Sequence, residues 1–170
     1  MKKKYNALIV GFGFWGPILA RNFQSSQYFN VHSICDSNSI NLNKAKNIYP
    51  NSIYYKSYKR ALDDPETDIV IISTPTKTHY KITKMALSKK KHVLCEKPLC
   101  LKLGQVKHLI SLSKKYKKFL FVDYPFIYSE SVNFIKKIFE KKTLGRPLIY
   151  ESTREKAPYR KDTNVIWDLG

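Results

Sequence analysis

Six residues near the start of the chain have the types and spacing of a phosphate-binding loop. Gly11-Phe12-Gly13-Phe14-Trp15-Gly16 directly follows an apolar run and directly precedes a helical pattern. There, the first glycine permits a tight turn, the second lets a pyrophosphate approach the backbone, and the third lets helix and strand pack closely. Amides at the helix N-terminus would hold the phosphates. We predict that all six residues line a dinucleotide site, the alternative being an ordinary glycine-containing loop.

A carboxylate follows at the distance expected for ribose recognition. Asp36 ends the second apolar run, twenty residues after Gly16, where it can accept both adenosine ribose hydroxyls. This carboxylate would repel the negatively charged 2′-phosphate of NADP, which favours NAD over NADP as the cofactor. Taken alone, an Asp at a strand end is more often a turn former.

The segment Ser73–His79 follows the most apolar strand-like run of the chain. Ligands of such folds lie at the carboxyl ends of the strands, so this loop should border the cofactor. We assign cofactor contacts to Thr74, Pro75, Thr76 and His79, and expect Thr76 or Thr78 to cap the next helix. His79 by itself is typical of a helix start rather than of a base.

Glu96-Lys97-Pro98 follows another apolar run and is expected at the same edge. Lys97 can donate to a substrate oxygen, and Glu96 can set the position and charge of that lysine. We assign all three residues to the cofactor site and Lys97 to catalysis. An isolated tripeptide of this kind would more often be a surface turn.

These residues are positioned by alternating strands and helices, the pattern of a parallel sheet covered on both faces. Expected strands are Tyr5–Val10, Phe29–Cys35, a piece near Tyr54, Asp68–Ser73, His92–Cys95 and Phe119–Val122. Expected helices are Trp15–Phe23, Asn43–Tyr49, Tyr58–Leu62, Thr78–Ser88 and Leu103–Tyr116. From Asp123 the rhythm changes to a helix over Glu130–Glu140, a turn at Gly145, a strand over Leu148–Thr153 and a helix start at Val165–Trp167.

The net charge of +18 is large for 170 residues, but only five of the 31 basic residues are Arg. Proteins that read phosphates or bases favour Arg forks, which form two parallel hydrogen bonds. The lysine excess therefore indicates a compositional bias more than a nucleic-acid surface. The three cysteines, Cys35, Cys95 and Cys100, indicate reduced thiols in a cytoplasmic protein, and no metal site is expected. No apolar run is long enough for a membrane span.

These segments resemble the Gfo/Idh/MocA oxidoreductases, a family named after glucose-fructose oxidoreductase and inositol dehydrogenase. The likeness rests on Gly11–Pro17, Ser73–His79, HVLCEKP at His92–Pro98 and NVIWDLG at Asn164–Gly170, in the family's order and intervals. It covers nearly the whole chain. The loop sequences are most similar to members that oxidise nucleotide-linked or amino sugars.

The resemblance implies a Rossmann-type, doubly wound dinucleotide-binding domain over residues 1–122, then the truncated start of an α/β substrate and oligomerisation domain over residues 123–170. By similarity, Lys97 hydrogen-bonds the hydroxyl that is oxidised, and Asp168 belongs to a catalytic D-x-G-x-H segment. The family's acid/base His would fall two residues past Gly170, so the chain is expected to be a fragment that binds nucleotide without useful turnover. The substrate contacts implied in this way are Lys97, Tyr124, Arg160, Asn164, Trp167 and Asp168.

We therefore expect part of an NAD-dependent dehydrogenase acting on a sugar or nucleotide sugar, a homo-oligomer at full length, with no nucleic-acid or membrane partner. At Asp123-Tyr124-Pro125, close relatives often have Gly-His-Thr, which leaves the substrate contact at Tyr124 open. Two alternatives stay open: a non-catalytic NAD-sensing regulator on the same fold, and a basic nucleic-acid-binding protein.

Overall fold

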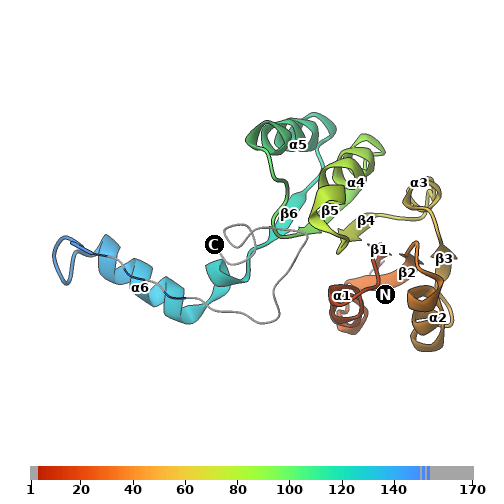
Figure 1. Cartoon of the computed structure of the whole chain (residues 1–170), viewed down its shortest axis with the longest axis horizontal. Helices are drawn as coiled ribbons and strands as arrows, with labels where there is room; N and C mark the ends of the chain where they lie inside the picture. Colours follow the sequence, from red (N-terminus) through yellow and green to blue (C-terminus); the bar gives the residue numbers. More distant parts are fainter. Residues whose placement is uncertain (1–3, 150, 152, 154–170) are drawn as a thin grey trace. The chain divides into compact units, whose positions relative to one another are not determined.

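Short apolar runs form the strands of a six-stranded parallel sheet, in the order β3-β2-β1-β4-β5-β6 (Figure 1). The computed structural model describes residues 4–149, 151 and 153. The chain divides into two units between Val122 and Asp123, and the sheet is formed almost entirely by the first. The strand order reverses between β1 and β4, as in a Rossmann fold, which confirms the predicted fold class. The strands are β1 (Tyr5–Val10), β2 (Phe29–Cys35), β3 (Ile53–Tyr55), β4 (Ile69–Ile72), β5 (His92–Glu96) and β6 (Leu120–Asp123).

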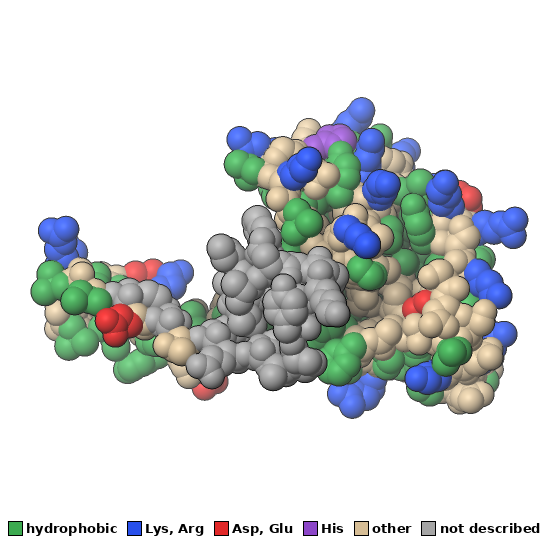
Figure 2. Space-filling model, viewed as in Figure 1, with side chains coloured by type: hydrophobic (Ala, Val, Ile, Leu, Met, Phe, Trp, Pro, Cys, Tyr) green, Lys and Arg blue, Asp and Glu red, His purple; other side chains and the backbone are tan. Residues whose placement is uncertain are grey.

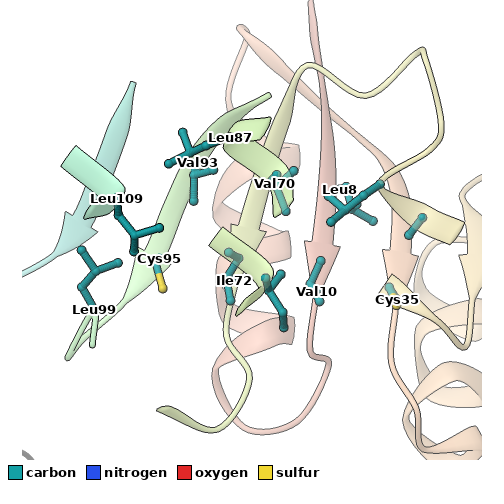
Figure 3. Close-up of a cluster of buried hydrophobic side chains, with 14 of the residues drawn as sticks. Leu8, Val10, Cys35, Val70, Ile72, Leu87, Val93, Cys95, Leu99 and Leu109 are labelled. Carbon is teal, nitrogen blue, oxygen red and sulfur yellow. The ribbon is translucent and has the colours of Figure 1, made fainter. Parts of the chain in front are cut away.

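Helices cover both faces of this sheet, which explains why its central strands are continuous apolar runs. On one face, α1 (Trp15–Ser25) and α2 (Ser39–Ile48) bury a cluster that includes Ala7 and Ile9 of β1. On the other face lie α3 (Tyr58–Ala61), α4 (Thr76–Ser88) and α5 (Leu103–Tyr116). There Leu8, Val10, Val70, Ile72, Val93 and Cys95 of the strands meet Leu87 and Leu109 of the helices (Figure 3).

Two helices begin earlier than the sequence predicts, and local hydrogen bonds give the reason for one of them. Helix α2 begins at Ser39 because the Asn38 side chain accepts the Ile40 amide at 2.8 Å and so caps the helix. Helix α4 begins at Thr76, directly after Pro75. The helix predicted over Trp15–Phe23 continues to Ser25. The other elements of the first unit match the predictions to within a residue.

The second unit contains a 3₁₀ helix, η1 (Pro125–Tyr128), which was not predicted, and α6 (Glu130–Glu140), which was. The strand predicted over Leu148–Thr153 is not observed: none of the described residues in that stretch lies in a strand. A strand needs a neighbour to bond its backbone groups, and the described sheet includes no residue of this stretch. The helix start predicted at Val165–Trp167 lies outside the described residues.

Basic side chains are scattered over the visible face of the first unit rather than gathered in one groove (Figure 2). That distribution agrees with a compositional lysine bias. Within the described residues, no helix is both long and apolar enough to cross a lipid bilayer.

Candidate functional site

The candidate site lies at the carboxyl edge of the sheet, where four predicted segments begin in register. Val10 of β1 pairs with Cys35 of β2 and with Ile72 of β4, and Ile72 pairs with Cys95 of β5. The residues that follow this row are Gly11, Asp36, Ser73 and Glu96. Residues far apart in the sequence therefore leave the sheet at one edge, which is where open α/β sheets bind ligands.

The three loop glycines differ in what surrounds them. Gly11 has φ +95°, and a Cβ there would lie 2.8 Å from Ser73 O, so both conformation and space require glycine. A Cβ on Gly16 would lie 2.2 Å from Gly11 O, because the first turn of α1 packs directly on the loop backbone. A Cβ on Gly13 would meet no described atom within 4 Å. Gly13, the second glycine, is thus the one with open space beside it, and it is where the motif lets a pyrophosphate approach the backbone.

The aromatic residues of the loop take two different environments. Phe12 is 2% exposed, and its ring packs edge-on against Tyr49 at 6.3 Å. The Phe12 side chain therefore belongs to the core, and a cofactor contact by this residue stays a prediction. Phe14 and Trp15 are exposed, with ring centroids 5.4 Å apart. No described side chain caps α1, whose first turn also contains no acidic residue.

Asp36 binds the glycine loop itself. Its Oδ2 accepts the Phe12 amide at 2.6 Å and the Asn41 side-chain amide at 3.1 Å, and its Oδ1 accepts the Asn38 amide at 2.8 Å. The Phe12 amide is therefore committed to Asp36 and is not free to hold a phosphate. Sequence analysis missed Asn41, since an Asn in a first helical turn carries no signal of this contact.

Three donors leave the Asp36 carboxylate with about one of its roughly four acceptor positions open. With the chain's own donors in place, it can accept one ribose hydroxyl rather than the two that we expected. Burial first, and then the Asp36 charge, raise the pKa of the Cys35 thiol to about 12. Cys35 thus stays protonated beside the carboxylate.

The loop between β4 and α4 is tied to the glycine loop and to itself. Ser73 donates its hydroxyl to Gly11 O at 2.8 Å. Thr78 donates its hydroxyl to Pro75 O at 2.7 Å, and its oxygen lies 2.7 Å from the Thr74 hydroxyl. The prediction that Thr76 or Thr78 caps α4 is wrong, because the helix begins at Thr76 and both residues lie inside its first turn.

His79, which we predict as a cofactor contact, has a buried ring between two loops of the site. Its ring is 1% exposed, with Nε2 2.7 Å from Thr74 O and Nδ1 2.9 Å from Pro98 O. A ring enclosed in this way joins two loops of the site and offers little surface to a ligand.

Glu96, Lys97 and Pro98 follow the predicted order at the end of β5. The Glu96 carboxylate accepts the Lys97 backbone amide at 3.2 Å, the Lys97–Pro98 peptide is cis, and Pro98 is buried. Lys97 is half-buried. The tripeptide is therefore part of the sheet edge and not a free surface turn.

The remaining predicted residues lie elsewhere. Tyr124 belongs to the second unit, where it is 47% exposed. Arg160, Asn164, Trp167 and Asp168 lie outside the described residues. Among the residues that the structure describes, no group of three or more His, Cys, Asp or Glu side chains is arranged to hold a metal ion.

Comparison with known proteins places this fold and edge in a family. The profile of the oxidoreductase family with an NAD-binding Rossmann fold, Gfo/Idh/MocA, matches residues 5–124. Myo-inositol 2-dehydrogenase of Thermotoga maritima is 30% identical over 151 residues, which are 88% of this chain and 45% of that protein.

Two solved structures extend the comparison. An NAD-binding protein from Listeria innocua superposes with a TM-score of 0.74 at 30% identity, over 84% of this chain and 42% of that one. Myo-inositol 2-dehydrogenase from Lactobacillus plantarum gives a TM-score of 0.76 at 28% identity, over 85% and 43%. The chain thus spans less than half the length of these relatives. It belongs to the Gfo/Idh/MocA oxidoreductase family, whose NAD-binding Rossmann domain its first unit forms.

Proposed function

We propose that this chain supplies the cofactor domain of an NAD-dependent dehydrogenase that oxidises a secondary hydroxyl of a polyol or sugar. The observation that carries the proposal is the register at the carboxyl edge. It places the glycine loop, the Asp36 carboxylate and the Glu96-Lys97-Pro98 segment one residue past a single row of paired strands.

The residues at this edge fit a dinucleotide. The missing side chain at Gly13 leaves space that no described atom fills, and the uncapped N-terminus of α1 presents amides and a positive dipole end to an anion. Gly13 and α1 would hold the pyrophosphate, and Asp36 would accept a ribose hydroxyl. The open acceptor position on Asp36 favours NAD, because a 2′-phosphate would lie beside a carboxylate.

When bound, the nicotinamide supplies the hydride acceptor of the reaction. The contribution of the chain itself is to orient and polarise the substrate hydroxyl. Lys97 is held at the sheet edge by the carboxylate of Glu96, which accepts its backbone amide. Its ammonium donates to the substrate oxygen, which orients the hydroxyl and stabilises negative charge on that oxygen.

Similarity favours a free polyol ring as the substrate. Two of the relatives compared above are myo-inositol 2-dehydrogenases. We therefore propose a cyclic polyol or simple sugar in preference to the nucleotide-linked sugar expected from the loop sequences.

Cofactor binding is tested on the chain with two matched glycine variants. Gly13 and Gly104 both have room for a side chain, since a Cβ at either meets no described atom within 4 Å. Gly104 lies in the first turn of α5, outside the glycine loop and the other predicted cofactor segments. We expect calorimetric titration to show NAD binding that Gly13→Val abolishes and Gly104→Val leaves unchanged, with both variants folded. A wild-type chain that binds no NAD, or equal affinities in all three proteins, would refute the site.

The substrate class is tested separately on the full-length enzyme. NADH formation is measured at saturating NAD with myo-inositol, scyllo-inositol, glucose and a uridine diphosphate sugar. Turnover of an inositol or glucose is expected. Turnover of the uridine diphosphate sugar alone would refute the polyol proposal and support a nucleotide-linked sugar as the substrate.

A further inference from the structure

One buried imidazole joins the two loops on either side of the proposed reaction centre. His79 lies in the first turn of α4. Its Nε2 is 2.7 Å from Thr74 O in the loop after β4, and its Nδ1 is 2.9 Å from Pro98 O in the segment after β5. Both are ordinary hydrogen-bond lengths. A single ring therefore bridges the ends of two neighbouring strands.

The chemistry of this bridge requires protons on the ring. Both partners are backbone carbonyl oxygens, which only accept, so each bond needs an N–H on the nitrogen that makes it. A neutral imidazole carries one N–H, and only the imidazolium carries two. An apolar residue in this position would leave the Pro98 carbonyl without this donor at a buried contact, since the ring is 1% exposed.

The carbonyl of Pro98 is the group through which the bridge reaches Lys97. Pro98 has no N–H of its own to bond and its φ is fixed by the ring. The next residue, Leu99, is buried beside Cys95 and Leu109 in the core (Figure 3). On the other side, the Glu96 carboxylate accepts the Lys97 amide. Fixing Pro98 O therefore fixes the orientation of the segment that carries Lys97.

We propose that His79 is a positioning residue: by donating from Nδ1 to Pro98 O, with Nε2 2.7 Å from Thr74 O in the loop after β4, it determines where the Lys97 ammonium lies. This inference rests on the proposed function in taking Lys97 as the group that binds the substrate oxygen. It assigns His79 no contact with NAD. The expected consequence is an effect on turnover that passes through Lys97, with little effect on NAD affinity.

A double-mutant cycle in the full-length enzyme tests the positioning role. His79→Phe keeps a ring without donors, and we expect it to lower kcat roughly 10- to 100-fold, since misplacing a reacting group by about 1 Å can cost 10²-fold. KM for NAD should change little, and His79→Asn, whose amide nitrogen can stand where Nδ1 does and donate to Pro98 O, should recover most of kcat. In a Lys97→Met background, His79→Phe should change kcat little, because the side chain that it positions is already absent.

Equal fold-losses in the wild-type and Lys97→Met backgrounds would overturn the inference. Tyr80→Phe is the matched control: it removes an exposed 2.8 Å hydrogen bond between the next residue of α4 and His108 of α5, neither of which is assigned to the site, and should leave kcat unchanged. If His79→Phe does not fold, His79→Gln, whose amide nitrogen stands where Nε2 does and faces Thr74 O instead of Pro98 O, is taken through the same cycle.

A second readout needs no activity, so it separates this inference from the proposed function. Nitrogen-15 NMR of the imidazole in the 170-residue chain should find a proton on Nδ1 of His79. A bare Nδ1 cannot donate to Pro98 O and would overturn the inference even in an active enzyme. An enzyme that turns over no polyol would instead refute the proposed function, and the NMR result would still decide whether His79 holds Pro98.

Discussion

Replacing Asp36 by Ala should remove the preference for NAD over NADP that we propose for this chain. The carboxylate has about one acceptor position open, on the oxygen that already accepts the Asn38 amide. A hydrogen bond to a charged group contributes ~1.5–3 kcal/mol. That range corresponds to roughly a 10- to 100-fold preference in dissociation constant. Repulsion between the 2′-phosphate of NADP and the carboxylate, ~1–4 kcal/mol per pair of unit charges at 4 Å near a surface, moves the expected preference toward the upper end.

The measured quantity is the ratio of the two dissociation constants, obtained by calorimetric titration of each protein with NAD and with NADP. The ratio is needed because Asp36→Ala also removes the acceptor of the Phe12 amide. The resulting damage to the glycine loop weakens both cofactors and cancels in the ratio. We expect a wild-type ratio between roughly 10 and 100 and a variant ratio near one.

Asp63→Ala provides the control, because it removes the same charge in the loop before β4, at the opposite end of that strand. Its carboxylate is 62% exposed and pairs with Lys89. This variant should keep the wild-type ratio. Equal affinities of wild type for the two cofactors, or a preference that survives in Asp36→Ala, would refute the ribose contact.

Four further outcomes are expected. Gly16→Ala should lower the free energy of unfolding by ~1–3 kcal/mol in a urea titration, because its Cβ would lie 2.2 Å from a backbone oxygen, whereas Gly104→Ala should not. Lys97→Met should lower turnover of the full-length enzyme by about 10²- to 10⁴-fold and leave the NAD dissociation constant unchanged by calorimetry; a near-normal rate would remove Lys97 from catalysis. Burial, and then the nearby Lys118 charge, lower the pKa of His92, so the unfolded chain takes up a proton below pH ~6.5 before the folded chain does. The free energy of unfolding should therefore decrease as the pH drops below that value. In His92→Gln, the urea midpoint of unfolding should depend less on pH. Burial raises the pKa of Cys100 to about 11, so at pH 8 only about one thiol in a thousand ionises, and a disulfide reagent should label it only on unfolding.

The sheet was predictable from the sequence because burial on both faces makes parallel strands continuous apolar runs. Tyr5–Val10 and Phe29–Cys35 match their predicted bounds in full. Helix α5 also matches, since its apolar residues recur at helical spacing. The errors fall at helix starts, where a single side chain decides. Asn38 can cap a helix or end a turn, and the difference is visible only once its oxygen meets the Ile40 amide.

The second unit was less predictable, and the strand expected over Leu148–Thr153 shows why. Alternation of apolar and polar residues indicates which backbone could join a sheet, but the strand forms only with a partner. Helix α6 depends on no such partner for its backbone bonds, and it was predicted in full.

At the site, local spacing identified the residues and missed their bonds. The positions of Gly11, Gly16 and Asp36 in the sequence predicted a turn, a close approach and a carboxylate at one edge. They gave no sign that Asp36 binds the Phe12 amide. Because of this contact, the Phe12 amide is not available to a phosphate, and the Asp36 carboxylate has one acceptor position fewer for a ribose hydroxyl. Likewise, His79 reads as a helix-start residue until its ring is seen between two carbonyls.

The missed bonds share one physical origin. In each, a side chain bonds the backbone of another loop: Asp36 to Phe12, Ser73 to Gly11 and His79 to Pro98, with the partners 24, 62 and 19 residues apart. Parallel strands are joined only by long crossovers, so loops that are neighbours at the sheet edge are distant in sequence. The receiving group is a backbone amide or carbonyl, which every residue type carries. A motif can therefore name the donor or acceptor side chain, whereas its partner follows only from the register of the strands.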